Sequence, residues 1–390
     1  MHFTKRLIGL MTGSVLLAGM AASAAQAQDD PVKIGMITTL SGGGSSLGID
    51  IRDGFMLAVN ANDGKLGGKD VDVLIEDDSR RPDKANQIAD KFIQRDEVDI
   101  LTGIVWSNLA LAVVPKAVRD GVFYVSPNAG PSELAGRMCH ENYFNVAYQN
   151  DNQHEAMGEG FNAEGFESAF LLAPNYPAGR DAIAGFKRFY EGEIAGEIFT
   201  QLGQQDYAAE IAAIRASDAD SVFIFLPGGM GIAFVKQYDQ AQLGLPLRGP
   251  GFSFSQDVLP AMGEAALGAR NAAQWSPDLD NPANQEFVAA FEQAYGRLPS
   301  VYASQAYDAA HLIGSALEQA SPDDADAFRA ALEEADFDSV RGDFEFGSNH
   351  HPIQDFYLRE VVEVDGVYTN RIDRKVFDDH QDAYVDECSM

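Results

Sequence analysis

Short apolar runs alternate with amphipathic segments along most of the chain, and this alternation constrains the fold more than any other feature. The apolar runs are continuous, which is typical of parallel strands that helices cover on both faces. Repeated strand–helix units of this kind predict an α/β fold with doubly wound parallel sheets. The expected strands are residues 32–38, 71–76, 100–105, 122–126, 143–146, 169–173, 194–199, 221–226 and 247–251, and the expected helices between them are residues 51–62, 83–95, 109–119, 152–164, 181–190, 207–216 and 232–242.

The alternation is interrupted twice. Residues 149–153 are wholly polar, and residues 276–282 read Ser-Pro-Asp-Leu-Asp-Asn-Pro. Two strand–helix series need two sheets, so we expect two lobes joined by several crossings, with a ligand cleft between them. After the second interruption we expect helices at 284–295, 301–320 and 324–334, and strands at 343–346, 354–364 and 367–372. The expected organisation is a first lobe of residues 28–147 plus 277–342, a second lobe of 148–276 plus 343–372, and a tail, 373–390, that returns to the first lobe.

The first 27 residues have the pattern of a secretory signal peptide. Lys5 and Arg6 form a short basic start, an uncharged apolar run covers residues 7–22, and Ala-Gln-Ala at 25–27 fits a cleavage site. The apolar run is shorter than the ~20 residues that a membrane-spanning helix needs. We therefore expect residues 1–27 to be removed and the mature protein to be located in a bacterial periplasm.

The chain is strongly acidic. It has 59 Asp and Glu residues against 28 Lys and Arg residues, which gives a net charge of -31. Such a chain repels phosphate backbones and anionic lipid surfaces, so we expect no nucleic-acid partner.

The chain has only two cysteines, Cys139 and Cys388. In an oxidising compartment this count favours a disulfide between them, and two free thiols are the alternative. Neither cysteine belongs to a C-x-x-C pair or a Cys/His cluster, and the adjacent His350 and His351 lack a placed acidic partner. We expect no metal site, no cofactor and no catalytic nucleophile, so the chain is interpreted as a binding protein rather than an enzyme.

Several short segments carry a resemblance to a known family, and two longer ones to a branch of it. The family segments are 33–35, 40–42, 76–78 with Pro82, and 125–130, and the branch segments are 173–179 and 225–231. Within the type I periplasmic binding proteins, the chain resembles the leucine/isoleucine/valine-binding receptors of ABC transporters. Two longer segments and Cys388 are similar to the branch that binds aromatic carboxylates. The resemblance implies a monomeric receptor that captures a small carboxylate and delivers it to an ABC permease at the inner membrane.

Candidate ligand contacts in the first lobe follow two expected strands. Ser107 lies between a strand and a helix, where free N–H groups and the positive end of a helix dipole favour an anion. The resemblance implies that a Ser at this position holds the ligand carboxylate, and the alternative is a simple helix cap. The neighbouring candidates are Trp106, Asn108, Asn128, Ala129 and Gly130.

The second lobe is expected to supply the opposite wall. Tyr176 lies in a loop after a strand, and the resemblance implies that a Tyr near this point covers the ligand. Phe252 and Phe254 are spaced by two on an extended segment, so both face one side, either as an aromatic wall or as core. The remaining candidates are Arg180, Pro227, Gly228, Gln305 and Tyr307.

Two glycines bear on the ligand class. By the resemblance, amino-acid receptors place a hydroxyl residue at the position of Gly130 and a Glu near Gly251, both for the ligand ammonium. A buried ammonium without such partners costs several kcal/mol. We therefore expect an aromatic acid, a hydroxycinnamate such as p-coumarate or a benzoate, bound by hinge closure. The alternatives are a receptor for branched-chain or other amino acids, and a ligand sensor that feeds a membrane signalling protein.

Overall fold

A computed structural model describes residues 2 and 30–390, and two sheets organise its body from Pro31 to Met390. The expected signal peptide lies almost wholly outside the described residues and stays a prediction. Among the described residues, no helix is long and apolar enough to cross a membrane.

The first sheet is built before residue 146. β1 pairs in parallel with both β3 and β4, so the chain reverses its direction of winding between these two neighbours. A crevice opens beyond the carboxyl ends of strands at such a switch point. The order is β2-β3-β1-β4-β5-β6, with β1 (Val32–Thr38), β2 (Lys65–Leu66), β3 (Lys69–Asp77), β4 (Ile100–Thr102), β5 (Phe123–Ser126) and β6 (Tyr143–Asn145).

The second sheet combines a parallel core with an antiparallel edge. β7, β8, β9, β10 and β11 run parallel to one another, whereas β13 is antiparallel to β11 and to β14. The order is β12-β13-β11-β10-β9-β7-β8, with β14 beside β13. The bounds are β7 (Ser168–Pro174), β8 (Glu193–Thr200), β9 (Ser221–Ile224), β10 (Leu247–Pro250), β11 (Arg270–Ala273), β12 (Glu345–Phe346), β13 (Pro352–Val364) and β14 (Val367–His380).

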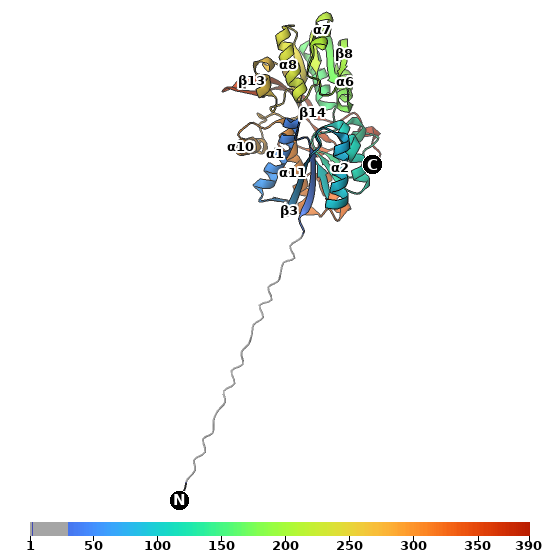
Figure 1. The fold of residues 1–390 in the computed structure, drawn as a ribbon, viewed down its shortest axis with the longest axis vertical. Helices are drawn as coiled ribbons and strands as arrows, with labels where there is room; N and C mark the ends of the chain where they lie inside the picture. The colour runs from blue at the N-terminus through green and yellow to red at the C-terminus, as the bar shows by residue number, and fades with distance from the viewer. Residues whose placement is uncertain (1, 3–29) are drawn as a thin grey trace. The chain divides into compact units, whose positions relative to one another are not determined.

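Helices cover both sheets (Figure 1). α1 packs along α11, and a Cβ at Gly54 of α1 would lie 2.1 Å from the Ala303 carbonyl oxygen, so glycine permits this close contact. The helices are α1 (Ser45–Ala61), α2 (Pro82–Lys91), α3 (Ser107–Arg119), α4 (Ser132–Ala135), α5 (Asn152–Glu164), α6 (Pro177–Phe189), α7 (Ala208–Ala216), α8 (Gly229–Ala241), α9 (Leu259–Met262), α10 (Pro282–Tyr295), α11 (Val301–Gln319) and α12 (Ala325–Glu334).

The predicted α/β class with two parallel-rich sheets is confirmed, and the differences lie at element ends. α1 begins six residues before the expected start, and β4 ends at Thr102 rather than at residue 105. β14 continues to His380, inside the segment expected as a tail, because it pairs along nearly the whole of β13. We call the first sheet with its packed helices the first lobe, and the second sheet with its packed helices the second lobe.

The predicted disulfide is present. The Sγ atoms of Cys139 and Cys388 are 2.10 Å apart and join positions separated by 249 residues. The bond ties the last residues of the chain to the loop after α4, which belongs to the first lobe.

Candidate functional site

A small cavity lies where loops of the two lobes meet. Its volume is about 20 Å³, which is room for roughly one water molecule. A ring-sized ligand therefore needs the side chains or the lobes around it to move apart. The wall is made by Leu47, Val105, Trp106, Ser107, Asn128, Tyr148, Asn150, His154, Tyr176, Ala178, Phe225, Pro227, Phe252 and Tyr302.

Six of the predicted contact residues share this wall. They come from the junction between β4 and α3, the loop after β5, and three loops of the second lobe, so both lobes contribute to the wall. These residues are Trp106, Ser107, Asn128, Tyr176, Pro227 and Phe252.

Three predicted residues of the loops lie behind the wall or away from it. The Ala129 carbonyl accepts hydrogen bonds from Ser126 Oγ and Tyr143 Oη, so it points into the first lobe. A Cβ at Gly130 would lie 2.1 Å from the Tyr148 carbonyl oxygen, which leaves no space for a side chain. Arg180 is exposed, with its Nη1 3.1 Å from Asn175 Oδ1.

The other five predicted residues also fall outside the wall. Asn108 follows Ser107 in α3, and Gly228 precedes α8. Phe254 and Gln305 are fully buried and do not line the cavity. Tyr307 lines a separate groove of about 1050 Å³ beside α11 and β2.

Ser107 occupies the corner that the sequence predicts. It is the first residue of α3, and Trp106 is the N-cap residue, without a side-chain capping bond. Ser107 Oγ instead accepts a hydrogen bond from Asn150 Nδ2 at 3.0 Å. The hydroxyl proton therefore remains free to donate toward the cavity, beside the first N–H groups of the helix.

Asn150 fixes this corner and was missed by sequence reasoning. Its Nδ2 also donates to Asp181 Oδ2 at 2.8 Å, and its Oδ1 accepts from Gly130 N at 3.2 Å. The polar run 149–153 indicated a break between the lobes, and each of its residues proves to be buried. A run of polar residues that is buried rather than solvated is the signal for a hydrogen-bonded site.

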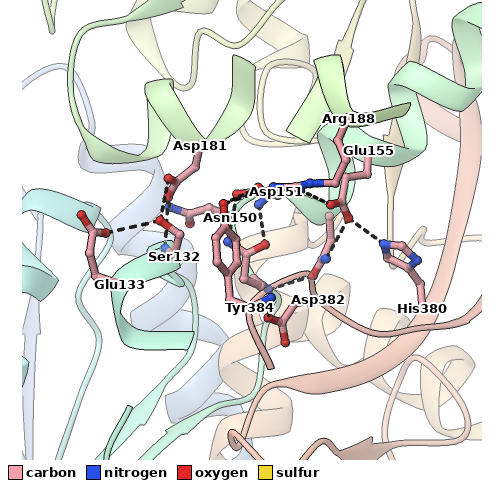
Figure 2. A network of polar contacts seen from close by, with 12 residues as sticks. Ser132, Glu133, Asn150, Asp151, Glu155, Asp181, Arg188, His380, Asp382 and Tyr384 are labelled. Carbon is pink, nitrogen blue, oxygen red and sulfur yellow. Dashed lines mark hydrogen bonds and ion pairs between the residues drawn. The ribbon is translucent and has the colours of Figure 1, made fainter. Parts of the chain in front are cut away.

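Asp181 connects the two lobes (Figure 2). It lies on α6 of the second lobe and accepts from Ser132 Oγ at 2.9 Å and Ser132 N at 3.2 Å, in the first lobe. Burial raises the pKa of Asp181 above its ordinary value, against the hydrogen bonds from Asn150 and Ser132.

The same network reaches the disulfide-linked tail (Figure 2). Tyr384 Oη donates to Asp151 Oδ2 at 3.0 Å, and Arg188 Nη1 lies 2.8 Å from the same oxygen. Glu155 pairs with Arg188 and with His380 Nε2, the latter at 2.6 Å. The hinge residues beside Asn150 are therefore held by the C-terminal segment.

Aromatic rings form most of the wall. Tyr176 and Phe225 are stacked at 6.2 Å between ring centroids, and Tyr148 and Phe252 are 4.7 Å apart. Trp106 Nε1 donates to Thr39 Oγ1 at 3.0 Å, which fixes the indole. The rings belong to Trp106, Tyr148, His154, Tyr176, Phe225, Phe252 and Tyr302.

No Asp, Glu, Lys or Arg belongs to the cavity wall as the structure describes it. Burial raises the pKa values of Tyr148, Tyr176 and Tyr302, so their hydroxyls stay protonated. Burial lowers the pKa of His154 to about 3, so its imidazole is neutral at pH 7. The wall therefore offers hydrogen-bond donors and aromatic surface without formal charge.

Two arrangements of chemically active side chains were looked for among the described residues, a metal-ligand cluster and a nucleophile motif. The described residues contain no group of three or more His, Cys, Asp or Glu side chains placed to hold a metal ion. Residues 44–48 match the spacing G-x-S-x-G, the pattern that carries the nucleophile in one class of hydrolases, although no catalytic nucleophile was expected. Its central Ser46 lies in the first turn of α1, and no histidine of residues 30–390 hydrogen bonds to it.

The sequence and structure resemble solute receptors along nearly their full length. The family described as "Periplasmic binding protein" matches residues 31–366. "Leu/Ile/Val-binding protein homolog 6" of Brucella melitensis is 29% identical over 369 residues, covering 90% of this chain and 93% of that protein. A Rhodopseudomonas palustris ABC-transporter solute-binding protein, solved with benzoate, is 33% identical with a TM-score of 0.87, covering 92% of this chain and 100% of that one. A second, from strain BisB5 and solved with 3,4-dihydroxybenzoic acid, is 28% identical with a TM-score of 0.83, covering 91% and 99%.

Proposed function

The chain belongs to the periplasmic binding protein family, and from this premise we propose that it is the receptor of an ABC importer for an aromatic carboxylate. One observation carries the proposal. The cavity wall joins a single anion corner at Ser107 to a belt of aromatic rings and has no charged side chain among the described residues. The solved relatives with benzoate and dihydroxybenzoate support the same ligand class.

The carboxylate is assigned to Ser107. Asn150 Nδ2 donates a hydrogen bond to the hydroxyl oxygen of Ser107. The hydroxyl therefore donates its own proton to the ligand. The α3 N-terminus adds backbone donors and the positive end of its dipole. A charge-assisted hydrogen bond of this kind contributes about 1.5–3 kcal/mol.

The ring is assigned to the aromatic belt. Burying roughly 150–200 Å² of aromatic surface at about 25 cal/mol/Å² contributes around 4–5 kcal/mol. Together with the carboxylate contacts, this is enough for a Kd near or below the micromolar range.

Closure of the two lobes around the ligand supplies the signal to the permease. Asn150 donates from one amide nitrogen both to Ser107 and to Asp181, and Asp181 reaches across to Ser132. A ligand that orders Ser107 therefore also orders the polar contact between the lobes. We place this monomeric receptor in the periplasm, beside the permease of the inner membrane.

An amino-acid ligand is the second candidate, because several relatives bear the name Leu/Ile/Val-binding protein homolog. The structure gives its ammonium no acidic partner in the described wall. Any side chain at Gly130 would meet the Tyr148 carbonyl at 2.1 Å, and at Gly251 it would meet Arg359 Nη2 at 2.7 Å. A sensor for a membrane signalling protein has the same site, and the genes next to its own distinguish it from a transport receptor.

A thermal-shift panel tests the ligand class. Benzoates and hydroxycinnamates are expected to raise the melting temperature, because a ligand that binds only the folded state stabilises it. Stabilisation by leucine or isoleucine, without a response to any aromatic acid, would replace this proposal with the amino-acid receptor.

A further inference from the structure

We infer that His154 recognises a hydroxyl group on the aromatic ring of the ligand. The preferred ligands are then ring-hydroxylated acids rather than benzoate itself. This inference rests on the proposed function and assigns a specificity-determining residue within its site.

His154 is a buried polar side chain without a partner. It lies in the first turn of α5, lines the cavity, and is 1% exposed. Its Nδ1 atom is fully buried and has no hydrogen-bond partner among residues 30–390. Buried polar groups are rarely left unsatisfied, because each such loss costs free energy. An apolar residue would fill an aromatic wall better, so the imidazole indicates a polar group on the ligand.

The environment of His154 determines which group it accepts. It is neutral at pH 7, because burial lowers its pKa to about 3. A neutral imidazole has one donor and one acceptor nitrogen, and a phenolic hydroxyl can use either of them. A carboxylate could use only the donor, and Ser107 already offers donors at the helix end.

The places of Ser107 and His154 in the two lobes assign the two ends of the ligand. Ser107 begins α3 of the first lobe, whereas His154 belongs to α5 of the second lobe. A rigid ring held between the lobes has its carboxylate at one end and its hydroxyl toward the other. A para or meta hydroxyl satisfies this arrangement, and an ortho hydroxyl, beside the carboxylate, does not.

The imidazole is held in place by packing. Its ring is 5.0 Å from that of Phe225 and 5.7 Å from that of Phe223, both edge to face. Tyr176 and Tyr302 are the other polar wall residues whose side chains lack a hydrogen-bond partner within the described chain. Their oxygens are not among the fully buried unsatisfied atoms, unlike Nδ1 of His154.

Calorimetry with matched ligands tests this assignment. For the wild-type protein we expect 4-hydroxybenzoate to bind at least tenfold tighter than benzoate and 2-hydroxybenzoate. His154→Phe should reduce that ratio to below threefold, and His154→Gln, which keeps a donor and an acceptor, should retain part of it. His311→Phe is the matched control, since His311 lines the separate groove beside α11, and it should leave the ratio unchanged.

The possible results distinguish a failure of the His154 assignment from a failure of the proposed receptor function. Equal wild-type Kd values for benzoate and 4-hydroxybenzoate would overturn the role of His154 and leave the aromatic-acid receptor standing. The role of His154 would also be overturned if the preference for 4-hydroxybenzoate over benzoate persisted in His154→Phe, or if only Tyr302→Phe abolished it. Binding of none of the aromatic acids would overturn the proposed function and this inference with it. If His154→Phe fails to fold by circular dichroism, the wild-type ratio and His154→Gln decide.

Discussion

Asn150 Nδ2 donates to Ser107 Oγ at 3.0 Å, so a residue at the crossing between the lobes orients the hydroxyl at the start of α3. The same nitrogen is 2.8 Å from Asp181 Oδ2 on the second lobe. Asn150 thereby makes the anion corner and the contact between the lobes one hydrogen-bonded unit. Ligand capture and closure are coupled through it in the mechanism proposed above.

Ser107→Ala is expected to weaken binding of an aromatic acid by roughly 10- to 150-fold, which corresponds to about 1.5–3 kcal/mol. The reason is the loss of the one side-chain hydroxyl that donates to the carboxylate. Isothermal titration calorimetry measures the change. Ser315→Ala is the control, since Ser315 Oγ donates to the Leu312 carbonyl within α11, away from the cavity. An unchanged Kd for Ser107→Ala would place the carboxylate elsewhere.

The Asp50 carboxyl should make stability depend on pH. Burial and nearby Asp257 raise its pKa from 3.8 to about 7, against the opposing effect of Arg297. Between these two values the folded protein holds a proton that the unfolded chain releases, so the free energy of unfolding falls as pH rises from about 4 to 7. Asp50→Asn removes this contribution, and its melting temperature should fall less over that range than that of the wild type.

For each kcal/mol of pH-dependent stability that Asp50 contributes, the change in melting temperature between about pH 4 and 7 should differ between the two proteins by on the order of 2 °C. Differential scanning calorimetry in buffers of constant ionic strength measures it. Asp326→Asn, at a side chain that is 95% exposed, is the control and should keep the wild-type slope. If the melting temperature of Asp50→Asn changed with pH as steeply as that of the wild type, Asp50 would titrate normally in the folded protein.

The Cys139–Cys388 disulfide should stabilise the folded chain. Its loop of 249 residues corresponds to about 5 kcal/mol at most in the chain-entropy account. The Cys139→Ser/Cys388→Ser double variant should melt at a lower temperature. Its tail, where Tyr384 contacts Asp151, should also lose protection of its backbone amides against hydrogen exchange. Mass spectrometry of non-reduced peptides verifies the bond in the wild type. Identical melting of both proteins would assign the tail no stabilising role.

The sequence predicted the fold well because parallel strands covered on both faces leave a strong pattern. The continuous apolar run 221–226 and the amphipathic run 152–164 each become an element with nearly the expected bounds, β9 and α5. The start of α1 was missed because Ser45 and Gly48 belong to a Gly- and Ser-rich stretch that resembles a loop. The length of β14 depends on pairing with β13, a contact that periodicity does not report.

The cavity was predicted less completely than the fold. Ser107 and Tyr176 follow strand ends, where topology itself indicates a site. Asn150 and His154 belong to the crossing and the first turn of α5, so only the packing of the two lobes brings them to the wall. Tyr302 lies on α11, far along the sequence, and the neighbouring Gln305 and Tyr307 were chosen in its place because helical phase is ambiguous at a helix start.

Titration calorimetry with benzoate, 4-hydroxybenzoate, p-coumarate and leucine on the mature wild-type protein tests the central claim most directly. At least one aromatic acid is expected to bind at or below micromolar Kd and at least a hundredfold more tightly than leucine, because the described wall has no acidic partner for an ammonium. That ratio corresponds to about 2.7 kcal/mol, within the cost of an unpaired buried ammonium. Tight leucine binding, with no heat from any of the aromatic acids, would contradict the account.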